Sequence, residues 1–364
     1  MRIFHLITHF DLGGAERVAA NIAASSTEDM EYHMVEIMRG SSAFTPKLLD
    51  EFKSHNIWCH RSWIPDIHFH FIFERVAALL FPIRLLYIML RWHPDVLHVH
   101  TEVPDMSVYA SCVMLKRLLK RVGIVRTIHN TCLWTGLPRL AVKVERMYID
   151  RHANIAISES VCDSYAKRFG DMPRTIRNGV SRVEQSPWPH LTEGKINVLF
   201  AGRFEKQKGI SVMCRVIQQL STDARYHFTI AGDGSLRHYV AQHLGGQENV
   251  SIVPPIYSLP SYMSSFDFLF MPSEFEGLGL QSVEASLNGL LVIANRCSGL
   301  CDTLPSDWPL FVDGNNVETY VRLFREILPT LNRQPLLTVA YDFVEKRFSL
   351  RAMQEAYEKV YRNI

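Results

Sequence analysis

The sequence predicts an α/β protein made of two doubly wound halves that face each other across a cleft. Two observations support this fold class. Apolar runs of strand length alternate with runs of helical periodicity, and the alternation stops at a stretch containing Ser186-Pro187-Trp188-Pro189 and then begins again. Such alternation is typical of parallel sheets with helices on both faces. We expect an N-terminal domain over residues 1–180, a C-terminal domain over 195–345 and a last helix within 346–364.

The first half contains five expected strands, each followed by a helical run. The strands are Arg2–Thr8, Tyr32–Met38, Val96–His100, Gly123–His129 and Ala153–Ile157. The helices are Gly14–Ser25, Phe44–His55, Asp105–Arg121, Leu137–Arg151 and one that Ser158 or Ser160 could cap. The most apolar segment, Phe69–Trp92, contains charges and Pro82, so it does not predict a transmembrane helix.

The second half repeats the pattern after a linker expected at Ser181–Gly194. Its strands are Asn197–Ala201, Tyr226–Ala231, Val250–Val253, Asp267–Met271 and Leu290–Ala294. Its helices are Ile210–Leu220, one after Gly234, Leu259–Ser264, Gly279–Leu287, Asn316–Leu328, Leu336–Phe348 and Leu350–Arg362.

Composition excludes several classes of protein. A hydrophobic content of 47% is ample for two cores, and a formal net charge of +2 argues against a nucleic-acid binder. The seven cysteines are odd in number and scattered, which favours reduced thiols. The N-terminal apolar run is too short for a signal peptide. We expect a cytoplasmic protein.

A glycine pair follows the first strand, where ligands bind in doubly wound folds. Gly13 and Gly14 allow a ligand to approach the backbone closely, and a helix N-terminus favours a negative group. The alternative is an ordinary strand-to-helix turn.

Three histidines fall at the ends of expected strands. His98 and His100 point to the same face of a regular strand, and His129 ends the next one. A metal site needs converging ligands, which the sequence does not show. We favour a hydrogen-bonding role for His129 at the cleft, and His98 and His100 as satisfied core histidines.

Basic residues gather at the end of the expected helix Asp105–Arg121. They are Lys116, Arg117, Lys120 and Arg121, interleaved with leucines. This pattern fits contact with an anionic membrane surface at the inner face of the membrane. It also fits a solvated helix face, and both alternatives stay open.

The second half carries cations and carboxylates near strand ends. Arg203 and Lys208 share one loop beside a helix start, a suitable site for a diphosphate. In the stretch Ser273–Ala285, a strand is followed by a glycine-containing turn and a helix. Glu276 lies in that turn, and Glu284 lies two helical turns later, pointing back toward it. An anion cradle with two carboxylates suits a sugar attached to a phosphate.

Three motifs carry a family resemblance. They are Gly13-Gly14-Ala15-Glu16-Arg17, Gly202-Arg203-x4-Lys208-Gly209 and Glu276-Gly277-Leu278-Gly279-Leu280-x3-Glu284-Ala285. In this order they resemble retaining glycosyltransferases of the GT-B fold, family 4, also called group 1. The family often has Phe where Leu278 stands. The stretch Asn295–Asp302 departs from the family's usual Gly-Gly pair and glutamate.

The resemblance implies a role for each motif residue. Arg203 and Lys208 would bind the donor diphosphate, Glu276 the hydroxyls of the transferred sugar and Glu284 the ribose. The N–H groups of Gly277, Leu278, Gly279 and Leu280 would face the phosphate or the sugar. Gly13 and Gly14 would close on the diphosphate from the other domain, His129 would lie beside the sugar, and the last helix would cross back to the N-terminal domain.

The resemblance also implies the reaction. The enzyme would move a sugar from a nucleotide diphosphate-sugar, with UDP favoured, to a lipid-linked or polysaccharide acceptor in surface polysaccharide synthesis. No Asp-x-Asp motif occurs in the chain, so we expect neither a metal nor another cofactor. The alternatives are a nucleotide-sugar epimerase of the same fold and a catalytically inactive scaffold subunit.

Overall fold

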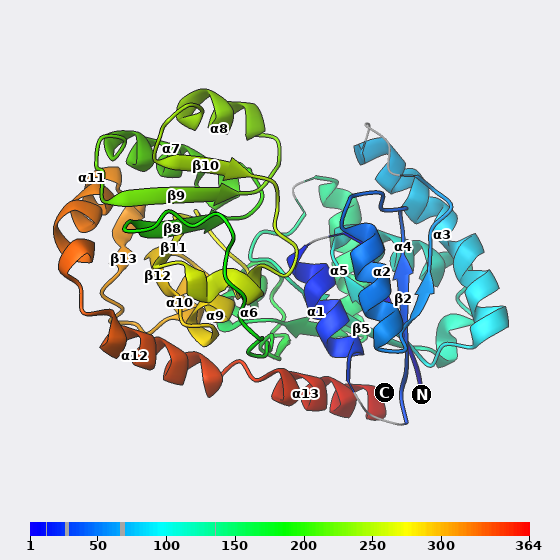
Figure 1. Cartoon of the computed structure of the whole chain (residues 1–364). Helices are drawn as coiled ribbons and strands as arrows, with labels where there is room; N and C mark the ends of the chain where they lie inside the picture. The colour runs from blue at the N-terminus through cyan, green and yellow to red at the C-terminus, as the bar shows by residue number, and fades with distance from the viewer. Residues whose placement is uncertain (12, 26–28, 66–69, 135) are drawn as a thin grey trace. The chain divides into compact units, whose positions relative to one another are not determined.

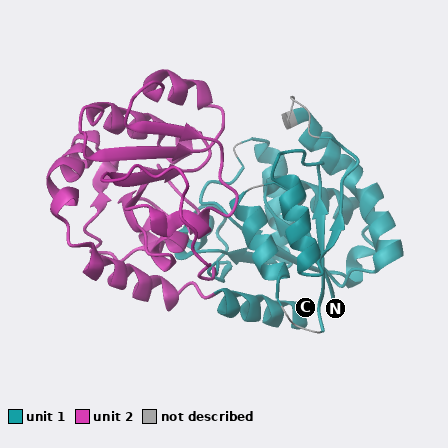
Figure 2. Cartoon of the chain, viewed as in Figure 1, with its two compact units in different colours: residues 1–179, 350–364 teal, residues 180–349 magenta. Residues whose placement is uncertain are grey.

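The computed structural model describes residues 1–11, 13–25, 29–65, 70–134 and 136–364. Leu12 of the first glycine loop and Phe69 of the apolar segment lie outside these ranges. The chain forms two compact units (Figure 2). Unit 1 contains residues Met1–Gly179 and Leu350–Ile364, and unit 2 contains Val180–Ser349. Residues 181–194, which the sequence predicts to be a linker, pack on unit 2, where the Ser186 N–H donates to the Ser261 carbonyl at 2.7 Å.

Unit 1 is built on a parallel seven-stranded sheet in the order β3-β2-β1-β4-β5-β6-β7 (Figure 1). The strands are β1 (Arg2–Ile7), β2 (Glu31–Glu36), β3 (Trp58–His60), β4 (Val96–His100), β5 (Gly123–Ile128), β6 (Asn154–Ala156) and β7 (Arg174–Thr175). The central strands are buried on both faces, which explains their continuous apolar runs. The short edge strands β3 and β7 lack such runs, and the sequence did not predict them.

Seven helices of unit 1 are described. They are α1 (Gly14–Ala23), α2 (Thr45–Ser54), α3 (His70–Trp92), α4 (Glu102–Met114), α5 (Pro138–Asp150), α6 (Glu159–Phe169) and α13 (Leu350–Arg362). Ser158 caps α6, because its hydroxyl accepts the Val161 N–H at 3.2 Å. The apolar segment, for which the sequence predicted no element, forms the 23-residue helix α3.

The predicted helix Asp105–Arg121 is wrong at both ends. It begins at Glu102, because proline is tolerated in a first helical turn and Pro104 does not delay the start. It ends at Met114, and the chain then turns through Leu119–Arg121 into β5. Buried Leu119 packs in this turn rather than on a helix face. Lys116 and Arg117 therefore lie in a turn.

The last helix, α13, belongs to unit 1, as the resemblance implies. Gln354 donates to the Asn21 carbonyl at 2.7 Å. The Tyr357 hydroxyl lies 2.9 Å from Thr127 Oγ1, and Tyr361 lies 2.7 Å from His98 Nδ1. The helix thus closes one face of the sheet with buried tyrosines.

Unit 2 has a parallel six-stranded sheet in the order β10-β9-β8-β11-β12-β13. The strands are β8 (Ile196–Ala201), β9 (Tyr226–Ala231), β10 (Val250–Val253), β11 (Phe268–Met271), β12 (Leu291–Asn295) and β13 (Phe311–Val312). Its helices are α7 (Ile210–Gln219), α8 (Arg237–Leu244), α9 (Leu280–Leu287), α10 (Leu300–Thr303), α11 (Val317–Arg322) and α12 (Arg333–Glu345). The predicted α/β class with two doubly wound sheets is confirmed.

The short helix predicted at Leu259–Ser264 is present as the 3-10 helix Leu259–Ser265. The bounds of another predicted helix in unit 2 need correction. The predicted helix Leu336–Phe348 is α12, which starts three residues earlier because Pro335 again fits in a first turn.

Candidate active-site residues

The two sequence motifs of unit 2 meet at the point where its strand order reverses. The Arg203–Lys208 loop follows β8 and the Glu276 turn follows β11, and these two strands pair in parallel at the centre of the sheet. One neighbouring crossover runs toward β9 and the other toward β12, and this is the place in an open parallel sheet where ligands usually bind.

An ion pair joins the two motifs. Lys208 Nζ lies 2.6 Å from Glu276 Oε1, although the residues are 68 positions apart. The Ser273 hydroxyl donates to the same carboxylate oxygen at 2.8 Å. Glu276 is buried, with 6% of its surface exposed, so its charge depends on these partners. The predicted partners of a sugar and a diphosphate are thus held together before any ligand binds.

Neighbouring loops hold the backbone of the Glu276 turn. The Glu274 N–H donates to the Gln207 carbonyl at 2.8 Å, and Gln207 Nε2 donates to the Phe275 carbonyl at 3.1 Å. From the other side, Asn295 Nδ2 donates to the Ser273 carbonyl at 2.9 Å. The turn is therefore fixed by residues that no motif of the sequence indicated.

Two glycines allow these loops to approach closely. Gly209 has a φ of +66°, and a Cβ there would lie 1.7 Å from the Pro272 carbonyl oxygen. Gly299 has a φ of +80°, and its Cβ would lie 2.6 Å from the Glu276 carbonyl oxygen. Only glycine fits both positions. The stretch Asn295–Asp302 departs from the family pattern, yet its Gly299 supports the Glu276 turn.

The other predicted residues of unit 2 lie close in sequence to Lys208 or to Glu276. Arg203 is exposed and, among the described residues, its guanidinium has neither a hydrogen bond nor an ion pair. Gly277, Leu278 and Gly279 lead into α9, whose first residue is Leu280. Gly279 is the N-cap residue with a φ of +77°, and Glu284 lies half-buried on the helix.

The glycine pair of unit 1 also lies at a strand-order reversal. Gly13 is the N-cap of α1 with extended backbone, and Gly14 begins the helix. A Cβ at Gly14 would meet no heavy atom within 4 Å, so space is open beside it. This loop follows β1, which pairs with β4 at the centre of the sheet.

His129 follows β5 and ends a row of hydrogen-bonded histidines. Its Nε2 lies 2.9 Å from His100 Nδ1, and His100 Nε2 lies 3.0 Å from His5 Nδ1. Burial lowers the pKa of both His5 and His129 to about 3, and burial together with neighbouring histidines lowers the pKa of His100 well below its usual value. The row is therefore neutral near pH 7 and can donate or accept hydrogen bonds.

His98 belongs to the same buried group. Its ring nitrogens lie 2.7 Å from the Tyr361 hydroxyl and 2.7 Å from Thr127 Oγ1. His5, His98 and His100 bring one nitrogen each within 4.8 Å of one another, a spacing that a metal ion could use. The hydrogen bonds already engage both nitrogens of His98 and of His100. The predicted core role of these two histidines agrees with these contacts.

Two further features at this part of unit 1 were not predicted. Thr101, after β4, has a φ of +71°, which is strained for a β-branched residue, and its hydroxyl lies 2.8 Å from Thr8 Oγ1. Arg126 of β5 is buried and forms ion pairs with Asp105 and Glu145, at 2.7 Å each. These pairs fix β5 against α4 and α5, three residues before His129.

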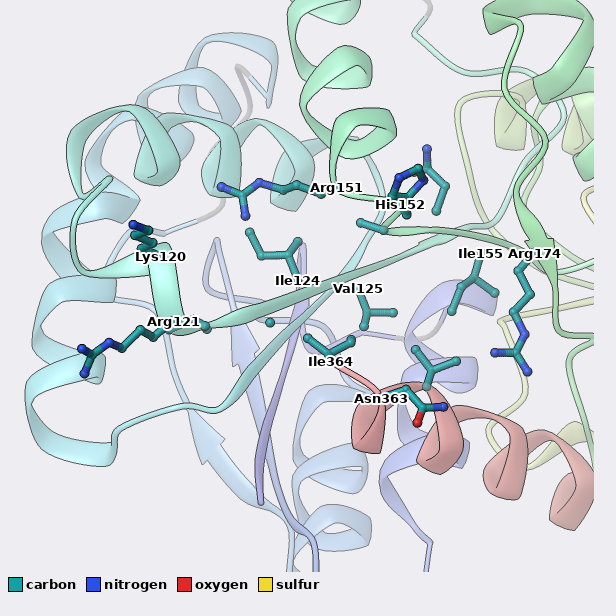
Figure 3. A pocket seen from close by; sticks show the side chains of 15 residues that line it. Lys120, Arg121, Ile124, Val125, Arg151, His152, Ile155, Arg174, Asn363 and Ile364 are labelled. Carbon is teal, nitrogen blue, oxygen red and sulfur yellow. The ribbon is translucent and has the colours of Figure 1, made fainter.

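A cavity of about 480 Å³ lies at the opposite edge of the same sheet (Figure 3). Gly123, Asn154 and Arg174, the first residues of β5, β6 and β7, line it. Its other basic side chains, Lys120, Arg121 and Arg151, extend from different sides and do not converge on one point. This cavity contains none of the predicted site residues.

The sequence also matches two protein families. Residues 183–332 match the family of glycosyl transferases group 1, and residues 12–183 match Glycosyltransferase Family 4. The chain belongs to the group 1 glycosyltransferases. Together the two matches span residues 12–332, which include every predicted site residue.

Similar proteins come from sugar-polymer gene regions and from structural studies. An uncharacterized 41.2 kDa protein in the cps region of Klebsiella pneumoniae is 29% identical over 58% of this chain and 62% of its own length. The O-antigen biosynthesis glycosyltransferase WclY of Escherichia coli is 28% identical over 44% of each chain. The crystal structure of Anabaena Alr3699/HepE with UDP and glucose covers 100% of both chains, with a TM-score of 0.80 and 14% identity. This likeness shows that the fold of this glycosyltransferase is GT-B.

The buried histidines predict that acid destabilises the fold. An unfolded histidine has a pKa near 6.5, whereas His5 and His129 stay neutral down to about pH 3 in the folded state. Below pH 6.5 the unfolded chain therefore binds protons that the folded chain does not. Each such histidine should lower the free energy of unfolding by about 2 kcal/mol between pH 7 and pH 5.

Chemical denaturation across this pH range tests the prediction. Asp105 acts in the opposite direction, because burial raises its pKa to about 7, but it contributes only one proton. His5→Gln should make the loss of stability with falling pH less steep by about one proton equivalent. Equal stability of the wild-type protein at pH 7 and pH 5 would contradict the assignment of neutral histidines.

Proposed function

We propose that this protein is a retaining, metal-independent glycosyltransferase that uses a nucleotide diphosphate-sugar, preferably a UDP-sugar. The observation that supports this most is the Lys208–Glu276 ion pair at the strand-order reversal of unit 2. It joins a cation suited to a diphosphate with a carboxylate suited to sugar hydroxyls. HepE, which has the same fold, binds UDP in one crystal structure and UDP-glucose in another, which supports the choice of nucleotide.

The donor diphosphate is assigned to Arg203 and Lys208. Arg203 is exposed and open to a ligand, and Lys208 lies half-buried beside the Glu276 turn. The charge on the diphosphate grows as the sugar departs, so fixed cations stabilise the transition state more than the ground state. The N–H groups from Gly277 to Leu280 lie at the start of α9 and add to this positive field.

The two carboxylates take different parts of the donor. Glu276 would accept hydrogen bonds from hydroxyls of the transferred sugar, because its position in the turn is fixed by Lys208 and Ser273. Glu284 would bind the ribose hydroxyls from α9. Gly13, Gly14 and His129 belong to unit 1, and their roles toward the diphosphate and the sugar follow from the family resemblance.

The reaction needs no protein nucleophile. The bond between the anomeric carbon and the phosphate oxygen breaks, and the acceptor oxygen forms its bond to that carbon on the same face. The acceptor proton passes to an oxygen of the departing phosphate, so charge and atoms balance. His129 is neutral near pH 7, which suits a hydrogen-bonding group beside the sugar rather than a cationic acid. Catalysis then consists of positioning and electrostatic stabilisation.

The acceptor is proposed to be lipid-linked or an oligosaccharide of a surface polysaccharide. The relatives encoded in a cps region and acting in O-antigen biosynthesis support this class. No helix among the described residues is long and apolar enough to cross a membrane. We propose a peripheral contact with an anionic membrane, at its cytoplasmic face, through exposed Lys116, Arg117, Lys120 and Arg121.

Replacing Glu276 tests its role toward the sugar. Glu276→Gln keeps the shape of the side chain but removes its charge, and turnover should fall by about 100-fold or more. Sugar transfer is measured with a panel of UDP-sugars, and the unfolding temperature confirms that the fold survives. Glu326→Gln, an exposed carboxylate of the same unit, is the matched control. Wild-type turnover in Glu276→Gln would remove this residue from the site.

Replacing Lys208 tests the diphosphate site separately from turnover. Lys208→Ala removes one cation and leaves Glu276 to repel phosphate, so the affinity for UDP should fall about 10- to 100-fold. Titration calorimetry with UDP, GDP and ADP measures this loss and identifies the preferred base. Lys206→Ala changes an exposed cation two residues away and should bind UDP like the wild type. Unchanged affinity in Lys208→Ala would contradict the assignment.

Metal removal tests the proposed role of the protein cations. Sugar transfer should persist after dialysis against EDTA, because Arg203 and Lys208 supply the charge that a divalent ion would otherwise provide. Transfer is compared before and after dialysis, with and without added magnesium or manganese. Complete loss of activity that either metal restores would overturn metal independence.

A further inference from the structure

Helix α3 presents a continuous apolar surface to solvent from Ile72 to Leu90. Seven large apolar side chains are exposed: Ile72, Val76, Leu79, Leu80, Ile83, Tyr87 and Leu90. At 100° per residue they fall within an arc of about 100°, which is the width of the stripe that a helix normally buries. Leu79 and Leu90 are 66% and 69% exposed. We call this surface the α3 stripe.

The opposite side of α3 is already used by the fold. Ala77, Phe81, Leu85 and Ile88 are buried in the core of unit 1, and the helix packs along α4 (Figure 1). The helix is therefore apolar on both sides, whereas a helix on the surface of a water-soluble domain normally has one polar side. A run of exposed apolar residues this long marks a surface that another apolar phase covers.

The charges around the α3 stripe indicate what covers it. Arg75 borders one edge of the stripe and Arg91 the other, and both are exposed. The only acidic residue of the helix, Glu74, lies on a different side. Past the end of the neighbouring helix α4, exposed Leu118 is surrounded in the sequence by the basic residues of the turn into β5. An apolar stripe bordered by cations is complementary to an anionic lipid bilayer.

A second copy of the chain fits this surface less well. A symmetric pair of α3 stripes would place four arginines, Arg75 and Arg91 of each copy, around one apolar contact. Such like charges repel unless acidic residues lie between them, and the stripe contains none. A bilayer with anionic headgroups supplies acyl chains for the stripe and negative charge for its borders.

We propose that α3 lies in the plane of an anionic membrane and inserts its stripe into the headgroup and acyl-chain boundary. The helix cannot be surrounded by lipid, because its other side is packed on the protein core. Insertion from one side reaches about 5–10 Å into the bilayer. This role rests on the membrane contact proposed above and adds to it a hydrophobic anchor that salt does not screen.

Vesicle sedimentation with the full-length protein, without donor or acceptor, tests the anchor independently of catalysis. The vesicles are phosphatidylcholine with or without about one-third phosphatidylglycerol, at about 0.05 M and about 0.5 M salt. The test variant is Leu79→Ser/Ile83→Ser. The matched control is Ile327→Ser/Val339→Ser, which changes two exposed apolar residues of unit 2.

The α3 variant should bind anionic vesicles at least about tenfold more weakly than the wild type, at both salt concentrations. The control should bind like the wild type, and Arg75→Gln/Arg91→Gln should weaken binding at low salt only. Unfolding temperatures show that the variants remain folded, which is expected because the replaced side chains are exposed.

Three outcomes would overturn the role of α3. If the α3 variant binds vesicles like the wild type, the stripe is not the anchor, and the basic contact proposed above can still hold. If the wild-type protein ignores anionic vesicles at low salt, both proposals fail. If the wild type is a dimer by light scattering, and the α3 variant is a monomer with unchanged vesicle binding, the stripe binds a second copy. None of these results changes the assignment of the donor site.

Discussion

The charged and polar side chains at the ends of the central strands need partners, and the neighbouring loops of each unit supply them. In unit 2, the Lys208–Glu276 ion pair lies where the strand order reverses, partly removed from water. A buried carboxylate is costly without a partner, so Ser273 and Lys208 must both stay within hydrogen-bonding distance. The glycines at 209 and 299 allow the neighbouring backbones to come close enough for this geometry. A diphosphate that attracts Lys208 would therefore change the surroundings of Glu276 directly, which would couple the proposed nucleotide contact of Lys208 to the proposed sugar contact of Glu276.

At the corresponding strand ends of unit 1, the hydrogen-bonded side chains are neutral histidines rather than an ion pair. His5, His98 and His100 are buried, half-buried His129 is hydrogen-bonded to His100, and desolvation keeps the protons off these histidines near pH 7. The buried charges of this unit include Arg126, whose two carboxylate partners, Asp105 and Glu145, exceed it by one negative charge if both ionise. Burial raises the pKa of Asp105 to about 7, which relieves this excess. If His129 contacts the sugar as proposed, a neutral histidine suits that uncharged ligand, whereas the proposed phosphate contacts of Arg203 and Lys208 suit a group on which negative charge develops.

The sequence predicted much of the fold because its strands are buried on both faces and therefore appear as distinct apolar runs. It also predicted Arg203, Lys208 and Glu276 as candidate site residues, because local motifs carry them. Gln207, Asn295 and Gly299 could not be predicted, since each acts on the Glu276 turn only after distant strands pair. His5 was missed for the same reason: its partner His100 lies on a neighbouring strand. The end of α4 was placed wrongly because apolar spacing continues past Met114, while the chain must turn there to enter β5.

The hydropathy of the α3 segment does not by itself predict which of its apolar residues are exposed. From sequence, an apolar run with Pro82 and several arginines fits neither a membrane span nor an amphipathic surface helix, because its apolar residues occur on all sides. The fold divides these residues into two groups by packing only one side on α4 and the core. The exposed apolar residues of the α3 stripe lie at helical spacing, bordered by Arg75 and Arg91. Apolar residues that were exposed without a function would not need this regular arrangement. The position of the arginines, rather than the amount of apolar surface, is what distinguishes a lipid-facing stripe from a dimer interface.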